Sequence, residues 1–194
     1  MSSGGFGSER NAHHDLPILF FPPLWLTFCR VVSFLYMSKN YFDLRELMVK
    51  VAEQELKKGA KEIGGNNRGA FVEKYLQVTG LKVPQPWCAA FVSWCLYEAG
   101  RRLKVKPKLP YTAGSRVLLN AAKRLKLVVP EPERGDLVFW TRGNPEGPFG
   151  HVGIVCSRKS DKIVTIEGNK GGRVCTLQYE LGKMPCLLGF ARVA

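Results

Sequence analysis

A thiol opens an apolar run in the segment Pro86-Trp87-Cys88-Ala89-Ala90-Phe91-Val92-Ser93-Trp94-Cys95. The apolar residues of this segment recur with helical spacing. Pro84 and Pro86 fix the entry into a helix that starts at Trp87 or Cys88. The unpaired N–H groups and the positive dipole end of a helix start stabilise a thiolate. Cys88 is therefore a candidate nucleophile, although a single cysteine among apolar residues is also an ordinary core residue.

A histidine follows 63 residues later in Gly150-His151-Val152-Gly153-Ile154-Val155. The other two histidines lie in the polar first fifteen residues, so His151 is the one histidine of the apolar, patterned region. The alternating segment predicts a strand with His151 at its mouth, where a side chain can face a cleft. A lone histidine is often structural, but an imidazole here can take a thiol proton and later give it to a leaving amine.

The next predicted strand ends in Thr165-Ile166-Glu167-Gly168-Asn169. Glu167 and Asn169 occupy alternate positions, so we expect their side chains on one face of the strand. One would accept a hydrogen bond from the far nitrogen of His151, and the other would polarise or position the site. The segment is equally suited to form a plain turn at the end of a strand.

Helical periodicity comes first along the chain and strand periodicity follows. Asp43 and Glu46 resemble a capping box that starts a helix, and further helices are predicted near 71–76 and from Ser115 to Leu125. The helix of Cys88 is expected to end at Gly100, and the last helix carries Val117, Leu118, Ala121, Ala122 and Leu125 on one side. Strands are predicted at 136–140, 151–157, 162–166, 174–179 and 188–193. This order predicts an α+β fold in which the nucleophile helix packs against an antiparallel sheet.

The chain has 194 residues and divides on composition into a leader, 1–36, and a domain, 37–194. The leader contains an apolar run, Leu16 to Met37, interrupted by two prolines and an arginine. It is a poor signal peptide and a weak membrane helix. The alternatives are an export or membrane segment, a packed piece of the fold, or an extension upstream of a natural start at Met37.

Charge and cysteines narrow the class of protein further. The net charge is +13, and Arg101 to Lys126 holds nine cationic side chains and no acidic one. Such a stretch attracts a polyanion, either nucleic acid, anionic lipid or a cell-wall polymer, or else is a solvated face. None of the six cysteines forms a CxxC pair, so no zinc site is indicated. Cys95, Cys156 and Cys175 are expected to be core residues.

Several motifs together resemble the CHAP domain, the cysteine- and histidine-dependent amidohydrolases/peptidases of bacteria and phages. They are Asn66-Asn67-Arg68-Gly69, Val72-Glu73-Lys74-Tyr75-Leu76, Pro86 to Cys95, Arg134-Gly135-Asp136-Leu137-Val138-Phe139-Trp140, Gly150 to Val155 and Ile166-Glu167-Gly168-Asn169. The resemblance implies a papain-like (NlpC/P60-type) fold and hydrolysis of peptidoglycan amide bonds. It makes Cys88 the nucleophile and His151 the base, with Glu167 and Asn169 completing the site. Some relatives bind calcium through an Asp-rich loop, but Gly64 to Gly69 contains no aspartate, so no metal and no cofactor are expected.

The sequence leaves the exact reaction open between a muramoyl-alanine amidase and a murein endopeptidase. Trp87, Trp140 and Tyr111 are candidate substrate-binding residues, although aromatic side chains at such positions are often core. A non-catalytic module that binds envelope polymers or nucleic acid is the alternative class. A related lipoprotein-type peptidase is disfavoured because Trp87 and Ala89-Ala90 replace its usual Asp and Ser-Gly. We expect a monomer at the cell envelope, or in the cytoplasm until release if phage-type, with no specific nucleic acid partner.

Overall fold

The computed structural model describes Met1 and residues 24–193, with side chains described from Tyr41 onward. The chain divides into two units, Met1–Leu35 and Tyr36–Ala194, and the second contains every predicted site residue. The predictions for Leu16 to Pro23 lie outside the described residues. Among the residues that are described, no helix combines the length and hydropathy needed to cross a membrane.

Four helices are present in the described part of the chain: α1 (Leu24–Lys57), α2 (Ala70–Gln77), α3 (Cys88–Leu103) and α4 (Ser115–Arg124). The predicted helix start at Asp43 is wrong, because Asp43 lies inside α1. Glu46, the second residue of the capping-box pattern, accepts instead from the guanidinium of Arg134 at 3.1 Å. Helix α3 passes the expected end at Gly100 and stops at Lys104, whose left-handed conformation closes its last turn.

The strands are β1 (Val128–Val129), β2 (Leu137–Thr141), β3 (Gly150–Lys159), β4 (Lys162–Glu167), β5 (Cys175–Glu180) and β6 (Leu187–Ala191). They form one sheet in the order β1-β6-β2-β3-β4-β5, and every neighbouring pair is antiparallel. The predicted α+β layout is confirmed. Strand β1 escaped prediction because two residues are too few to show an alternating pattern.

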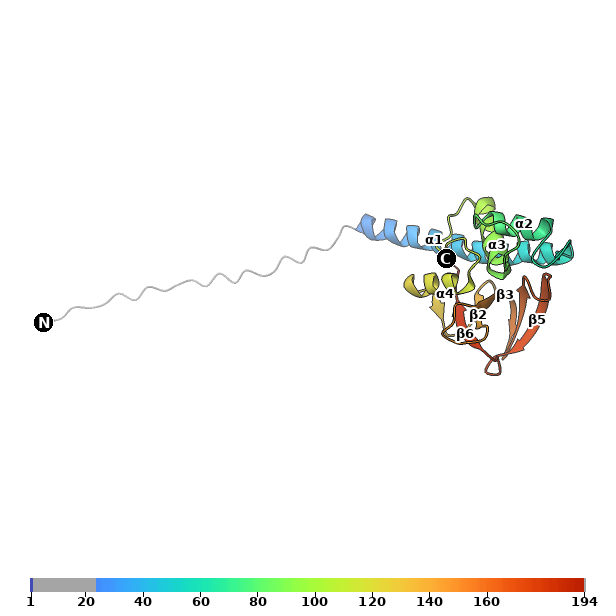
Figure 1. Ribbon diagram of the computed structural model, residues 1–194. Helices are drawn as coiled ribbons and strands as arrows, with labels where there is room; N and C mark the ends of the chain where they lie inside the picture. The colour runs from blue at the N-terminus through green and yellow to red at the C-terminus, as the bar shows by residue number, and fades with distance from the viewer. Residues whose placement is uncertain (2–23, 194) are drawn as a thin grey trace. The chain divides into compact units, whose positions relative to one another are not determined.

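Helices α2 and α3 lie on one side of the sheet (Figure 1). Apolar residues are buried on both faces of the sheet. On β2, Leu137 and Phe139 pack into the cluster that also contains the apolar residues of the helices, whereas Val138 and Trp140 belong to a second cluster. This division follows the alternation of side chains along a strand. Helix α3 therefore packs on one face, and the other face holds a smaller core of its own.

The segment Arg134-Gly135-Asp136 ties α1 to the sheet. The buried carboxylate of Asp136 accepts hydrogen bonds from Arg45 of α1, from Arg192 after β6 and from the backbone of Glu133. Gly135 has a φ of 85°, and a Cβ there would lie 2.5 Å from the Cβ of Arg45. This motif is therefore a structural anchor, because a buried charge is stable only with such partners.

Two predictions about burial are wrong. Val117 and Leu125 of the α4 region are exposed, whereas Leu118, Ala121 and Ala122 face the core as expected. Cys156 and Cys175 are half-buried rather than core residues, because each lies at a strand position whose side chain is only partly covered. Cys95 is fully buried, as predicted.

Candidate active site

Cys88 is the first residue of α3, as the sequence predicts. The residue before it, Trp87, is fully buried, and its indole N–H donates to Glu62 Oε1 at 2.9 Å. The N–H of Phe91 donates to the carbonyl of Trp87 at 2.8 Å, which sets the first helical turn. Packing of Trp87 therefore fixes the thiol at the helix start, where its side chain is only slightly exposed.

His151 lies at the start of β3 and is buried beside Glu167, the last residue of β4. Nε2 of His151 is 2.8 Å from Oε2 of Glu167. Nδ1 lies 2.9 Å from Nη2 of Arg142. Because a guanidinium can only donate, Nδ1 accepts from Arg142 and Nε2–H donates to the carboxylate. The predicted pairing of Glu167 with the imidazole is present in the structure.

The carboxylate of Glu167 has two further donors that the sequence analysis missed. Thr165 Oγ and Tyr179 OH donate to its Oε1 at 2.7 and 2.9 Å. Thr165 carried a signal, since it stands two residues before Glu167 on the same strand face. Nothing in the sequence indicated Tyr179, because its contact with Glu167 depends on the register between β4 and β5.

The environment shifts the pKa values of the thiol and the imidazole in opposite directions. Burial alone would raise the pKa of Cys88, but hydrogen bonding to His151, the charges of His151 and Arg142, and the N–H of Ala89 outweigh it and lower the pKa. Burial likewise disfavours the imidazolium, yet Cys88 and Glu167 raise the pKa of His151. Such opposed shifts favour a thiolate–imidazolium pair when Nδ1 of His151 is not occupied by Arg142.

The second cysteine of α3 behaves differently. Complete burial raises the pKa of Cys95 well above that of an ordinary thiol, and the nearby carboxylates of Glu55 and Glu98 reinforce this effect. Cys95 is therefore a neutral core residue, and the environment distinguishes it clearly from Cys88.

Two glycines of the motifs make room for this arrangement. A Cβ on Gly153 would lie 2.7 Å from Cγ of Glu167, and a Cβ on Gly168 would lie 2.6 Å from Cβ of Phe91 in α3. Separations under 3.0 Å force neighbouring atoms to move. The glycines at 153 and 168 therefore allow Glu167 to lie flat against β3 and the end of β4 to approach α3.

Asn169 does not share the strand face of Glu167. Strand β4 ends at Glu167, and Asn169 has a φ of 57°, so the alternation used to place it does not extend that far. Its side-chain N–H donates to Oδ1 of Asn67 at 3.1 Å. Asn169 thus connects the β4–β5 turn to the loop that follows α1, and its predicted catalytic role stays a prediction.

The three aromatic residues predicted to bind substrate occupy different places. Trp87 is completely buried, so it supports the helix start instead of contacting a ligand. Trp140 lies directly opposite His151 in the sheet, with ring centroids 5.7 Å apart. Tyr111 is exposed and packs edge-on against Tyr97 of α3, with centroids 5.7 Å apart.

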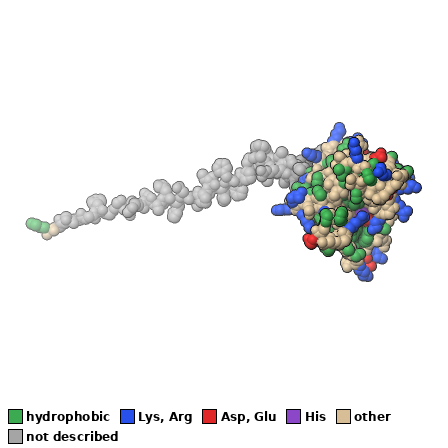
Figure 2. Space-filling view, viewed as in Figure 1, with side chains coloured by type: hydrophobic (Ala, Val, Ile, Leu, Met, Phe, Trp, Pro, Cys, Tyr) green, Lys and Arg blue, Asp and Glu red, His purple; other side chains and the backbone are tan. Residues whose placement is uncertain are grey.

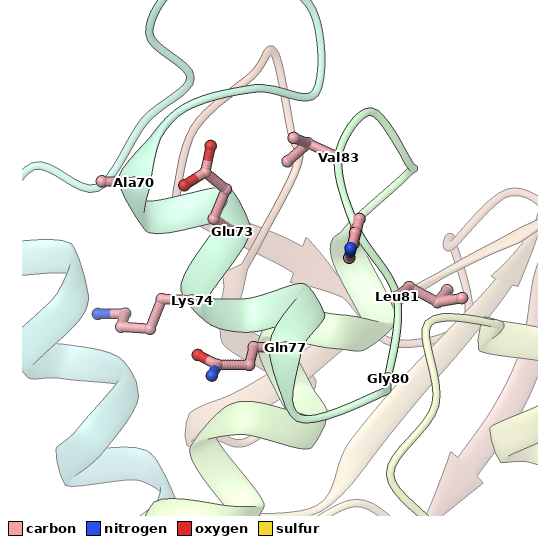
Figure 3. A pocket seen from close by; sticks show the side chains of 8 residues that line it. Ala70, Glu73, Lys74, Gln77, Gly80, Leu81 and Val83 are labelled. Carbon is pink, nitrogen blue, oxygen red and sulfur yellow. The ribbon is translucent and has the colours of Figure 1, made fainter.

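The three aromatic residues also differ in the cavities that they line. Trp140, Arg142 and His151 line a cavity of about 200 Å³. Tyr111 lines two other hollows on the surface of α3. A larger hollow of about 640 Å³ between α2 and the segment Gly80 to Val83 contains none of the predicted site residues (Figure 3). Of these, the small cavity is the one that reaches the imidazole.

Metal-ligating side chains do not converge anywhere in the part of the chain that the structure describes, where no group of three or more His, Cys, Asp or Glu could hold an ion. The loop Gly64 to Gly69, which resembles the calcium loop of relatives in position, bonds instead within the protein. Ile63 N–H donates to the carbonyl of Arg68, and Asn67 accepts from Asn169.

A helix-start thiol with a lowered pKa, an imidazole and a buried carboxylate are the parts of a cysteine-dependent hydrolase. Residues 80–169 match the family model of the CHAP domain. The family that this model describes is one of peptidoglycan-hydrolase-type amidases and peptidases. The fold is accordingly of the papain-like kind that the resemblance implied. No curated protein and no solved structure matches the chain.

Proposed function

We propose that this protein hydrolyses an amide bond of peptidoglycan through Cys88. The observation that carries the proposal is the hydrogen bond between His151 and the buried Glu167. It lies beside Cys88, a helix-start thiol whose pKa His151 lowers. Glu167 occupies Nε2, so Nδ1 is the nitrogen that exchanges a proton with the thiol. The bond cleaved is either the muramoyl–alanine amide or an amide within the peptide.

The chemistry proceeds in two steps. The thiol proton moves to Nδ1 of His151, and the sulfur attacks the carbonyl carbon of the scissile amide. The C–N bond breaks as His151 returns that proton to the leaving amine, which leaves an acyl thioester on Cys88. His151 then takes a proton from water, the hydroxide attacks the thioester, and the thiolate leaves. The carboxylate of Glu167 stabilises the imidazolium in both steps.

Digestion of purified peptidoglycan tests this function. The full chain is expected to release fragments whose new amine and carboxyl termini, identified by mass spectrometry, name the bond. Cys88→Ala should release none, whereas Cys95→Ala, a matched change on the same helix, should retain most activity. Binding of peptidoglycan without any new termini would favour the alternative class, a non-catalytic envelope-binding module.

We further propose that anionic envelope polymers contact the surface around Tyr97 and Tyr111, which would place the protein at the cell envelope. These two tyrosines are shared by hollows of about 690 and 350 Å³. The cations that line the two hollows are Lys58, Lys74, Arg101, Arg102, Lys104 and Lys106. Within the residues that the structure describes, two carboxylates, Glu55 and Glu98, pair with these six cations, so positive charge is in excess. This arrangement is called the Tyr97–Tyr111 surface below.

The cationic stretch of the sequence does not act as one surface. Lys108 lies over the ring of Tyr41, and Arg116 donates to the carbonyls of Pro145 and Gly147. Lys and Arg side chains are also spread across the face drawn in Figure 2 rather than gathered in one place. The proposal for a polymer contact therefore rests on the Tyr97–Tyr111 surface, where cations and exposed aromatic rings meet.

A further inference from the structure

The small cavity beside His151 has a cationic lining. Arg142 and Lys170 line it together with the rings of Trp140 and Tyr179. The carboxylate nearest to the imidazole, Glu167, is buried and already accepts from His151, Thr165 and Tyr179. Positive charge on the wall of the cavity is thus left without a counter-charge. We call this cavity the Arg142 pocket.

Arg142 makes an unusual contact in this pocket. Its guanidinium donates to the neutral nitrogen Nδ1 of His151, whereas a guanidinium binds most strongly to the two oxygens of a carboxylate. Neither Arg142 nor Lys170 has a carboxylate within ion-pair distance in the part of the chain that the structure describes. The side chain of Arg142 is exposed, so it is accessible to a ligand.

Backbone hydrogen bonds fix the main chain around Arg142, so only its side chain is free to move. Arg142 N–H donates to the carbonyl of Phe149 at 3.2 Å, and Thr141 N–H donates to the carbonyl of Cys186 at 2.9 Å. Arg116 of α4 holds the loop between β2 and β3 by its carbonyls. A change of partner by Arg142 therefore requires only a side-chain rotation, with the loop in place.

The contact also conflicts with the proposed chemistry. Nδ1 is the nitrogen that must take the proton of Cys88, and it cannot be protonated while it accepts a hydrogen bond from a cation. The thiol proton can move to Nδ1 only in molecules whose Arg142 has turned away, so Arg142 and Cys88 compete for this nitrogen. A ligand that attracts the guanidinium more strongly than an imidazole does would release Nδ1.

We propose that the Arg142 pocket binds a free carboxylate of the substrate, next to the scissile amide, and that this carboxylate draws Arg142 away from Nδ1 of His151. The inference rests on the proposed amide hydrolysis and names the substrate feature that the site requires. Lys170 contributes a second positive charge to the bound carboxylate. Substrates with a carboxamide at this position lack the charge that attracts Arg142, and they are cleaved slowly.

The test compares kcat/KM for two soluble muropeptides. One has a free carboxylate beside the scissile bond, and the other has a carboxamide in its place. Charged hydrogen bonds of this kind correspond to roughly a 10- to 100-fold preference in kcat/KM for the carboxylate form. Arg142→Gln should reduce the preference to near unity, and Arg142→Lys should restore part of it. Lys159→Gln, an exposed change at the far end of β3, should leave the ratio as it is.

Equal cleavage of the two forms by the unchanged protein, or a preference that survives Arg142→Gln, would overturn the proposal. A binding measurement separates this result from a failure of the hydrolase function itself. Acetate titrated onto the full chain should shift the ring resonances of His151 in a saturable way, and Arg142→Gln should abolish the shift. Saturable acetate binding without hydrolysis of either muropeptide would refute the hydrolase while retaining the pocket. Absence of any acetate effect would refute the pocket.

Discussion

Replacing Glu167 by Gln should lower the pKa of His151 and slow hydrolysis. The carboxylate lies 2.8 Å from Nε2 in a buried site, and its negative charge favours the imidazolium. A hydrogen bond to a charged group contributes about 1.5–3 kcal/mol. At 1.36 kcal/mol per pKa unit, this corresponds to a fall of roughly 1–2 units in the pKa of His151. Because the loss of the carboxylate destabilises the protonated form, the alkaline limit of activity should move to lower pH.

The assay is an NMR titration of the His151 ring together with the pH profile of kcat/KM. The variant should show a 10- to 100-fold lower kcat/KM near neutral pH, in proportion to the smaller ion-pair population. Glu180→Gln on the neighbouring strand, whose carboxylate pairs with Lys183 on the surface, is the matched control and should change neither quantity. An unchanged pKa of His151 in Glu167→Gln would refute the role given to this carboxylate.

Three further changes test other parts of the account. Gly153→Ala should displace Glu167, because the new Cβ would lie 2.7 Å from Cγ of Glu167. The variant should have a lower kcat/KM with little change in KM, and a normal kcat would show that β3 adjusts freely. Cys95→Ala should lower the free energy of unfolding by on the order of 1 kcal/mol, measured by urea denaturation, and a large loss of activity instead would assign it a role in the site. Neutralising Lys104 and Lys106 should weaken binding to intact walls and flatten its salt dependence while sparing small muropeptides; equal damage to both substrates would place these lysines at the active site.

Features of the fold and the site that depend on local periodicity could be predicted from the sequence. The helix start at Cys88 follows from its prolines and apolar spacing, and the strand of His151 follows from its alternation. The contact between His151 and Glu167 was also predictable, because two adjacent strands carry them at their ends. These features require only that neighbouring elements pair in the usual way.

Features that depend on tertiary packing could not be predicted in this way. Trp87 looked like a groove residue, but its indole is buried against Glu62, a partner 25 residues away. Asn169 was placed by strand alternation beyond the point where the strand ends. Arg142 had no sequence signal at all, because its contact with His151 exists only through the register of β2 and β3.

The most direct test of an activated nucleophile is competition among the thiols for iodoacetamide at mildly acidic pH. Cys88 is almost completely buried, whereas Cys186 is exposed, so access alone favours Cys186. A lowered pKa gives Cys88 a larger thiolate fraction than an ordinary thiol has at the same pH. The account predicts that peptide mapping finds the label first on Cys88, and that His151→Gln removes this advantage. Labelling of Cys186 or Cys95 ahead of Cys88 at that pH would contradict it.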